Sequence, residues 1–252
     1  MKKFANILIT GASSGIGEAL ALYYAAHGAK NLFLSGRNLE RLSSVKERCQ
    51  KFGVHTDIRQ IDVTNRQEME AWLQECQQKA PLDIVFANAG ISTGEETMVN
   101  IYNTFETNIM GVLNTILPTI EIFRNTAHGA KTLVITSSIA GYHGLAACPS
   151  YSATKACVKA YGEALRNQLK PEGIQVNVIC PGFVKSRITD KNTCPMPFFM
   201  NAEKAAEIIA QRVEKNIGLI TFPWPMRFAA WLISILPNCI SDYIYASLPH
   251  KV

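Results

Sequence analysis

Residues 5–17 read Ala-Asn-Ile-Leu-Ile-Thr-Gly-Ala-Ser-Ser-Gly-Ile-Gly, and this stretch decides the fold. Residues 5–10 form a short apolar run that ends at a glycine, which is typical of a buried strand. A helical pattern follows the glycines through Ala19, Leu20 and Tyr23. In this context the glycines let a diphosphate approach closely, and the helix N-terminus offers it free N–H groups. A glycine-rich turn alone is often only a turn, so the flanking strand and helix carry the prediction of a phosphate site.

The rest of the chain repeats the alternation of strand and helix. Continuous apolar runs predict further strands at 31–34, 54–61, 82–87, 131–136, 174–180 and 218–222. Helical patterns occupy 38–51, 65–79, 101–116, 151–170 and 202–216. We predict a doubly wound α/β fold of the Rossmann type, with about seven parallel strands and helices on both faces. No linker or repeat interrupts the pattern, so we expect a single domain over 1–252, with a core of about 5–222 and a C-terminal extension at 223–252.

Composition excludes several classes of protein. Of the 252 residues 48% are apolar and 18% are charged, so much of the chain must lie inside a core or at an interface. The net charge of +5 comes from lysines and arginines spread along the chain, which predicts no nucleic-acid partner. Seven cysteines without a C-x-x-C pair indicate a reducing compartment, and no histidine or cysteine spacing indicates a metal site.

The ends of the chain bear on where the protein works. A strand follows Met1-Lys2-Lys3 directly, and no run of 18 apolar residues exists. We therefore expect neither an export signal nor a transmembrane helix. A cytoplasmic location follows, with peripheral contact at a membrane surface as the other option.

Glycines and polar residues follow directly after most of the predicted strands. Because the carboxyl ends of parallel strands form the ligand crevice of such a sheet, we expect these residues to converge on one site. They are Gly11, Arg37, Asp62, Asn88, Ser138 and Pro181.

Arg37 bears on the choice of nucleotide. It lies twenty residues past Gly17, where a site for an unphosphorylated ribose would place Asp or Glu. An arginine there can form a forked pair with a 2′-phosphate, although a surface arginine that opens the next helix is the simpler alternative. The missing carboxylate favours NADP(H), with NAD(H) as the less favoured cofactor.

Residues 151–155 read Tyr-Ser-Ala-Thr-Lys, and Tyr151 is the one tyrosine of eight with a lysine at the fourth position after it. Side chains four apart lie on the same face of a helix, so the Lys155 ammonium should approach the Tyr151 phenol. A nearby positive charge favours the phenolate, so we expect the pKa of Tyr151 to fall toward neutrality. Such a phenol can exchange a proton at a carbonyl or carbinol. A solvated helix face with an extended lysine is the alternative.

Together these motifs resemble the short-chain dehydrogenase/reductase family over roughly residues 5–220. The resemblance implies an NADP-dependent oxidoreductase that interconverts a carbonyl and an alcohol. Tyr151 would be the general acid/base, and Lys155 would lower its pKa and hold the nicotinamide ribose. Ser138 would bind the substrate oxygen, and Asn108 would kink its helix and anchor a water for proton relay. The matching motifs are Gly11-x-x-x-Gly15-x-Gly17, Asn88-Ala89-Gly90, Ser138 and Tyr151-x-x-x-Lys155.

The resemblance also implies which residues bind the cofactor. They are Gly11, Ser13, Ser14, Gly15, Ile16, Gly17, Arg37, Asp62, Val63, Asn88, Ala89, Gly90, Tyr151, Lys155, Pro181, Gly182, Val184 and Ser186. Two of them depart from the family pattern. Many NADP-binding members carry a basic residue at Ser14, so Arg37 alone supports NADP. Ser186 stands where threonine is commoner, but the hydroxyl is kept.

Residues 187–200 should lie over the substrate pocket, and their apolar members predict a lipophilic ketone, aldehyde or alcohol. A lid packed shut on the core is the alternative. Two other functions stay open: a redox sensor that binds the cofactor without catalysis, and a lipid-carbonyl reductase at a membrane surface. The apolar members are Met196, Phe198, Phe199 and Met200.

Four small residues line the predicted Tyr151 helix and predict a homodimer or homotetramer, because small side chains let a second helix approach closely. Close packing of this helix on its own sheet would favour alanine equally. The residues are Ala153, Ala156, Ala160 and Ala164.

Residues 223–248 should be buried against something other than their own core. Met226 to Leu236 predicts a short helix that is apolar nearly all round, and Pro237 ends it. Such a helix spans about 16 Å, which is too short to cross a bilayer. We expect burial against a partner subunit or the substrate pocket first, and a membrane interface second.

Overall fold

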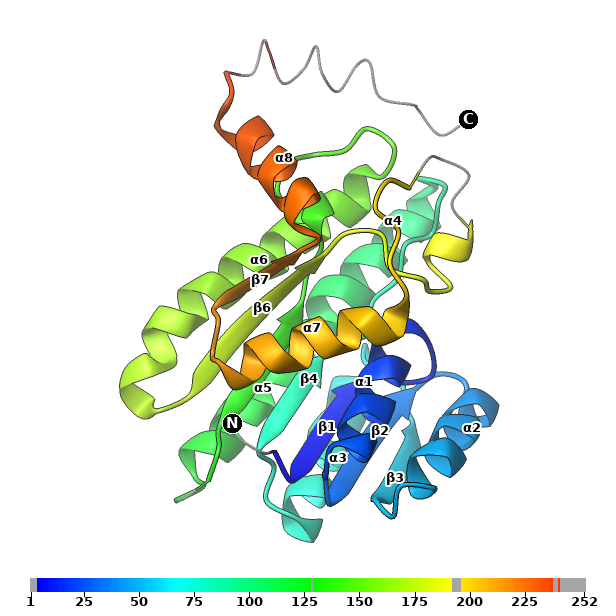
Figure 1. The fold of residues 1–252 in the computed structure, drawn as a ribbon, viewed down its shortest axis with the longest axis vertical. Helices are drawn as coiled ribbons and strands as arrows, with labels where there is room; N and C mark the ends of the chain where they lie inside the picture. The colour runs from blue at the N-terminus through cyan, green and yellow to red at the C-terminus, as the bar shows by residue number, and fades with distance from the viewer. Residues whose placement is uncertain (1–3, 128, 192–195, 238–239, 241–252) are drawn as a thin grey trace.

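The computed structural model forms a seven-stranded parallel sheet (Figure 1). The structure describes residues 4–127, 129–191, 196–237 and 240. The strand order is β3-β2-β1-β4-β5-β6-β7, and every neighbouring pair is parallel. This confirms the predicted doubly wound fold. The strands are β1 (Asn6–Thr10), β2 (Asn31–Gly36), β3 (His55–Gln60), β4 (Ile84–Ala87), β5 (Thr132–Thr136), β6 (Gln175–Pro181) and β7 (Leu219–Phe222).

Helices cover both faces of the sheet, as Figure 1 shows. Successive side chains of a strand point to opposite faces, so Ile7 and Ile9 enter one core while Leu8 enters the other. The first core lies under α1 (Gly15–Ala26), α2 (Leu39–Gln50) and α7 (Ala202–Glu214). The second lies under α3 (Arg66–Lys79), α5 (Gly111–Arg124) and α6 (Pro149–Leu169).

The predicted helix at 101–116 is interrupted in the structure. It consists of α4 (Met98–Phe105), a π-helical turn η1 (Glu106–Met110) and the start of α5. The remaining short turns are η2 (Ile139–Gly141), η3 (Lys170–Glu172) and η4 (Thr189–Lys191). Hydrophobic spacing does not distinguish a π-turn from an α-turn, so the sequence predicts one helix here.

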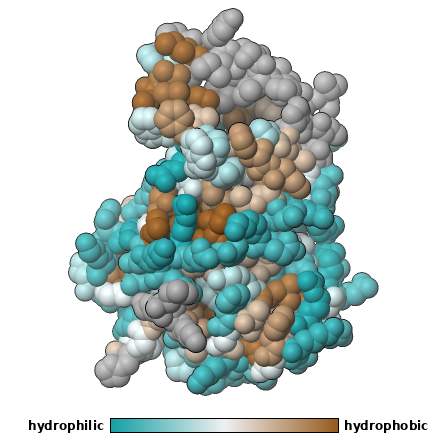
Figure 2. Space-filling model, viewed as in Figure 1, coloured by the Kyte–Doolittle hydropathy of each residue, from teal (hydrophilic) through white to brown (hydrophobic). Residues whose placement is uncertain are grey.

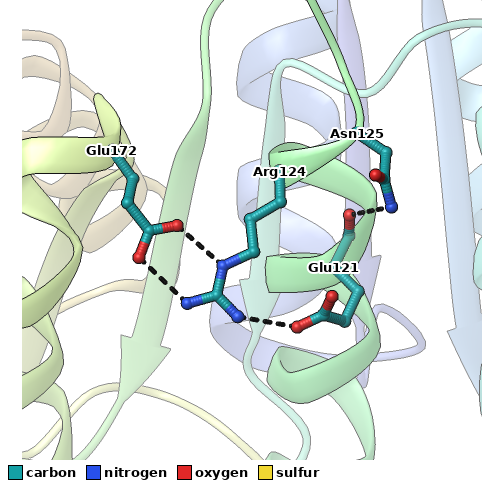
Figure 3. Close-up of polar contacts among 4 residues, drawn as sticks. All are labelled: Glu121, Arg124, Asn125 and Glu172. Atoms are coloured by element: carbon teal, nitrogen blue, oxygen red, sulfur yellow. Dashed lines mark hydrogen bonds and ion pairs between the residues drawn. The ribbon is translucent and has the colours of Figure 1, made fainter.

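An ion-pair network ties α5 to η3 at the edge of the sheet where β5 and β6 begin (Figure 3). Arg124 forms a forked pair with Glu172, with Nε–Oε2 and Nη2–Oε1 distances of 2.7 and 2.9 Å. It also donates to Glu121 at 2.7 Å. The network lies at the amino ends of the strands, opposite the carboxyl ends that form the crevice. It therefore stabilises the fold and does not belong to the crevice.

The last described helix, α8 (Trp224–Ile235), follows β7 and projects from the end of the molecule (Figure 1). It begins two residues before the predicted start and ends one residue before Leu236. None of its residues is buried. In the part of the chain that the structure describes, no helix has both the length and the hydrophobicity needed to cross a membrane. Of the predicted segment 223–248, residues 238–239 and 241–248 lie outside the described residues.

Candidate active site

A cleft of about 680 Å³ lies at the carboxyl ends of the strands. Residues that follow β1, β2, β3, β4, β5 and β6 all line it, so the predicted convergence is what the structure shows. Its walls contain all of the predicted cofactor residues except Gly17: Gly11, Ser13, Ser14, Gly15, Ile16, Arg37, Asp62, Val63, Asn88, Ala89, Gly90, Tyr151, Lys155, Pro181, Gly182, Val184 and Ser186.

The glycine turn is shaped by close contacts. Gly11 and Gly15 have φ angles of +67° and +58°, a region that side chains disfavour. A Cβ on Gly11 would lie 2.8 Å from Ala89 Cα, and one on Gly15 would lie 2.9 Å from Ser186 Cβ. Gly17 does not line the cleft, because it packs against the turn itself: a Cβ there would lie 2.4 Å from the Gly11 carbonyl oxygen. Gly17 therefore has a packing role in the turn, and its predicted contact with the cofactor stays a prediction.

The turn fits an anionic ligand. Ser14 caps α1 without a side-chain hydrogen bond, and Ser14, Gly15 and Ile16 all line the cleft. The first N–H groups of a helix have no partner within the helix, and the helix dipole is positive there. The start of α1 can therefore hold the diphosphate of a dinucleotide.

Thr10, which the sequence reasoning did not single out, fixes the loop after β4. Its buried hydroxyl donates to the Phe86 carbonyl at 3.2 Å and accepts from the N–H groups of Asn88 and Ala89 at 3.0 and 3.1 Å. The Asn88 amide donates back to the Thr10 carbonyl at 3.0 Å. A threonine that ends an otherwise apolar buried strand is the signal that could have identified it.

Lys155 lies behind this loop. Its Nζ donates to the Thr136 carbonyl at 3.0 Å and lies 5.6 Å from the centre of the Tyr151 ring. The Ser137 hydroxyl donates to the Lys155 carbonyl at 2.7 Å and so joins α6 to the end of β5. The lysine side chain is buried, and the tyrosine is partly exposed on the cleft wall. The predicted pair is thus brought together.

The predicted fall in the pKa of Tyr151 is wrong for the chain by itself. Burial raises this pKa to about 12, although a hydrogen bond with Ser138 lowers it in part. Burial also lowers the pKa of Lys155 to about 8. Desolvation disfavours both charged forms and is the largest cause of both shifts. At neutral pH Tyr151 therefore keeps its proton.

Ser138 follows β5 and caps η2, where its Oγ accepts from the Ala140 N–H at 3.1 Å. It lines the same cleft as Tyr151 and Lys155. Three of the four predicted catalytic residues therefore line the same cleft.

Asn108, the fourth, lies in the π-turn η1 and does not line the cleft. Its Oδ1 accepts from the Ile91 N–H at 2.8 Å, and its Nδ2 donates to the Ile91 carbonyl at 2.9 Å and to Thr154 Oγ1 at 3.1 Å. The side chain therefore ties the loop after β4 to α6. A Cβ on Gly90 would lie 3.2 Å from both Asn108 Oδ1 and Lys155 Nζ. The absence of a side chain at Gly90 therefore lets both polar groups approach the loop after β4.

A second arginine joins Arg37 at the cleft. Arg41 lies four residues on, lines the cleft, and has a buried Nε without a hydrogen-bond partner among the described residues. Arg37 is mostly exposed, and its Nη1 lies 4.0 Å from Asp62 Oδ2. Two guanidinium groups on this wall, one just before α2 and one in its first turn, fit a phosphate better than the single arginine that the sequence suggested.

The segment 187–200 meets the prediction only in part. Arg187, Ile188 and Thr189 line the cleft, whereas the four apolar residues expected over the pocket do not. Phe198 and Phe199 are 58% and 46% exposed. Met200 pairs with Val184 through its backbone. Residues 192–195 lie outside the described residues.

Glu96 holds the start of α6, and the sequence reasoning missed it. Its Oε1 accepts from the Ser150 N–H at 3.1 Å and from the Ser150 hydroxyl at 2.8 Å. A carboxylate is stabilised at a helix N-terminus. Ser150, the residue that Glu96 binds, directly precedes Tyr151 in the chain. Polar residues of α4 and η1 complete the wall beyond it: Asn100, Asn103, Glu106 and Thr107.

Replacing Lys155 by methionine should stabilise the fold at neutral pH. Below about pH 8 the folded chain carries a buried ammonium, which costs free energy relative to the unfolded chain. We expect Lys155→Met to raise the free energy of unfolding at pH 7 by roughly 1–3 kcal/mol, after the loss of the hydrogen bond to Thr136. Between pH 8 and the ordinary lysine pKa of 10.5, only the unfolded chain is protonated, so the parent gains stability as pH rises.

Urea unfolding of parent and variant at pH 7 and about pH 9.5 measures this difference. The advantage of the variant should shrink at the higher pH. The matched control is Lys159→Met, because Lys159 is only partly buried and pairs with Glu163 at 3.1 Å. An advantage of the same size at both pH values would contradict the buried-ammonium argument.

Comparison with known proteins agrees with this geometry. The family model for short chain dehydrogenases matches residues 5–195. An uncharacterized oxidoreductase of Myxococcus xanthus is 34% identical over 247 residues, which cover 95% of each chain. An uncharacterized oxidoreductase of Mycobacterium tuberculosis is 31% identical and covers 92% of this chain and 94% of its own.

Solved structures share the fold. A short-chain dehydrogenase/reductase from Burkholderia phymatum in complex with NAD superposes with a TM-score of 0.83 at 21% identity, covering 100% of this chain and 98% of its own. A short-chain dehydrogenase from Sphingobium yanoikuyae in complex with NADPH gives 0.79 at 22% identity, covering 98% and 97%. With the family model and the relatives above 30% identity, these findings settle the family: the chain belongs to the short-chain dehydrogenases/reductases.

Proposed function

We propose that the protein is an NADP(H)-dependent oxidoreductase that interconverts a carbonyl and an alcohol on a lipophilic small molecule. One observation carries the proposal. Ser138, Tyr151 and Lys155 line the same cleft as the glycine turn that fits a diphosphate. An acid, an oxygen-binding hydroxyl and a nucleotide site thus share one space.

Tyr151 holds its proton at neutral pH, so it can serve as the acid when the carbonyl is reduced. When bound, the cofactor supplies the hydride to the carbonyl carbon. Tyr151 would donate its proton to the carbonyl oxygen, and its raised pKa keeps that proton available at neutral pH. Ser138 would donate a hydrogen bond to the same oxygen, where negative charge develops. Lys155, charged below about pH 8, would favour the phenolate that remains.

The preference for NADP(H) is supported by the arginine pair. Arg37 and Arg41 both line the cleft beyond β2, where a carboxylate would serve a free ribose. Asp62 also lies at this rim, 4.0 Å from Arg37, but it follows β3 and not β2.

A lipophilic substrate is supported by apolar side chains near the catalytic residues. Ile91, Val184 and Ile188 line the cleft on segments that follow β4 and β6. They supply the kind of apolar wall that small-molecule sites use to bind nonpolar groups.

The test is an assay of NADPH oxidation with a series of methyl ketones and aldehydes of increasing chain length. We expect turnover, with kcat/KM rising by up to about fourfold per added methylene while the site can still bury it. A polyol-like sugar ketone serves as the polar control. Activity with no member of the series would contradict the proposal, and a flat series would contradict its lipophilic part.

We also propose that the protein is a homodimer or homotetramer. All four alanines of α6 are exposed, which supports contact with a second copy over packing on their own sheet. Large exposed apolar residues lie on α4 and η1, which contact α6: Tyr102, Phe105 and Met110. A small-residue stripe with an apolar surround suits a helix from a second copy.

Light scattering should therefore give a multiple of the 27.8 kDa chain mass at micromolar concentration. Ala160→Arg should shift the protein to monomers, because a long charged side chain blocks the approach of a second helix. The matched control is Ala71→Arg, at an exposed alanine of α3. A parent protein that is already monomeric would rule out this interface.

A further inference from the structure

Five large apolar side chains form one exposed stripe on α8. Their positions follow the spacing i, i+4, i+7, i+8 and i+11, which places them on a single face of a helix. Figure 2 shows this apolar surface at the upper end of the molecule. The α8 stripe consists of Trp224 (77% exposed), Phe228 (55%), Trp231 (50%), Leu232 (40%) and Ile235 (58%).

The other side of α8 anchors it next to the active site. A Cβ on Gly182 would lie 2.7 Å from Met226 Sδ, so the two residues are in close contact, and Gly182 lines the cleft. The helix also packs on η2, which begins directly after Ser138. The partly buried residues of α8 are Pro225, Met226, Ala230 and Ile233, and the last three lie on the face opposite the stripe, so the stripe faces away from the body of the protein.

A second copy of the chain is a poor occupant for this surface. The exposed area of the α8 stripe is on the order of 600 Å², below the roughly 800 Å² per partner of a standard stable interface. The helix also projects from the end of the molecule, as Figure 1 shows, and a protein partner would need a groove complementary to it. A lipid surface needs no such groove.

The chemistry of the helix suits a bilayer surface. Between residues 216 and 241 the sequence contains no Asp or Glu, and Arg227 is its one charged residue. Two tryptophans and a phenylalanine are the side chains that favour the region between headgroups and acyl chains. At 1.5 Å per residue the helix is about 18 Å long, so it can lie in that region but cannot span it.

We propose that α8 docks the protein on a lipid bilayer, with the α8 stripe inserted among the headgroups and Arg227 beside the phosphates. The contact of Met226 with Gly182 then holds the cleft close to the bilayer, from which an apolar substrate can enter. Docking itself does not depend on the proposed reaction; only the route of the substrate does.

Tryptophan fluorescence of the full chain with vesicles of phosphatidylcholine and phosphatidylglycerol tests the docking. The chain has three tryptophans, and Trp72 is buried in the core, so a change on adding vesicles reports on Trp224 and Trp231. We expect a blue shift and protection from acrylamide, together with flotation of the protein with the vesicles. No shift and no flotation would overturn the proposal.

A pair of variants separates docking through the α8 stripe from nonspecific adsorption of exposed aromatic side chains to vesicles. The double variant Trp224→Ala/Trp231→Ala should float at least about tenfold less than the parent, which corresponds to 1.4 kcal/mol. Phe52→Ala should float like the parent, because Phe52 is an aromatic of similar exposure (56%) after α2. Equal losses in both variants would overturn the role of the stripe.

Two measurements without lipid test whether the double variant keeps the fold and the oligomeric state of the parent. Thermal unfolding of the double variant should match that of the parent, because neither tryptophan contributes to the core. Light scattering should give the same mass for both proteins. A smaller mass for the double variant would identify the stripe as an interface between copies and overturn the proposal. Because neither measurement nor flotation requires turnover, failure of docking is distinguishable from failure of the proposed reaction.

Discussion

Tyr151→Phe should lower kcat for carbonyl reduction by about 10²- to 10⁴-fold while NADPH binding stays nearly unchanged. The substitution keeps the ring, its packing and its place 5.6 Å from Lys155 Nζ, and it removes only the hydroxyl that carries the proton. Stopped-flow measurement of the NADPH oxidation rate and titration of NADPH fluorescence measure the two quantities separately.

Tyr142→Phe is the matched control for this loss. Tyr142 is a second partly buried tyrosine near the site, and its hydroxyl hydrogen-bonds Thr221 Oγ1 at 2.8 Å. It does not line the cleft. The control should therefore lose a little stability and keep its turnover. Equal turnover in Tyr151→Phe and the parent would end the proposed mechanism, whichever carbonyl compound is used.

The strands other than β3 and their order along the chain could be predicted because their residues are buried on both faces, whereas β3 is mostly exposed or half-buried. Runs such as Asn6–Thr10 and Thr132–Thr136 are continuous and apolar, and the predicted bounds agree with the observed strands within two residues. The convergence of the site follows from the same fact, since parallel strands end at one edge. For this reason Arg37, Asn88 and Ser138 could be grouped from sequence alone.

Features that depend on side-chain contacts could not be predicted. Arg41 lies within an ordinary helical pattern, and only the fold shows that its guanidinium reaches the cleft. The pKa of Tyr151 depends on how deeply the phenol is buried, which the spacing to Lys155 does not reveal. Phe198 and Phe199 are apolar in sequence, but their positions outside the cleft depend on how the segment before α7 is routed.

The choice of cofactor gives the second large effect. The parent should bind NADPH about ten- to a hundredfold more tightly than NADH, because a charge-assisted hydrogen bond to the 2′-phosphate is worth about 1.5–3 kcal/mol. Arg37→Asp should reverse this order. The aspartate would repel the phosphate, and it would accept a hydrogen bond from the free 2′-hydroxyl of NADH.

Arg41 refines the prediction, because it stays in place when Arg37 is replaced. Arg41→Met should lower the preference for NADPH without reversing it, since Arg37 still faces the phosphate and no new carboxylate is introduced.

Arg59→Asp changes the net charge as Arg37→Asp does, but Arg59 pairs with Glu75 on β3 and α3 and does not line the cleft. It should leave the ratio of the two dissociation constants unchanged, which separates a local contact from a change in the overall field. Isothermal titration of each protein with both cofactors gives these ratios, and equal dissociation constants in the parent would refute the assignment of the 2′-phosphate to this arginine pair.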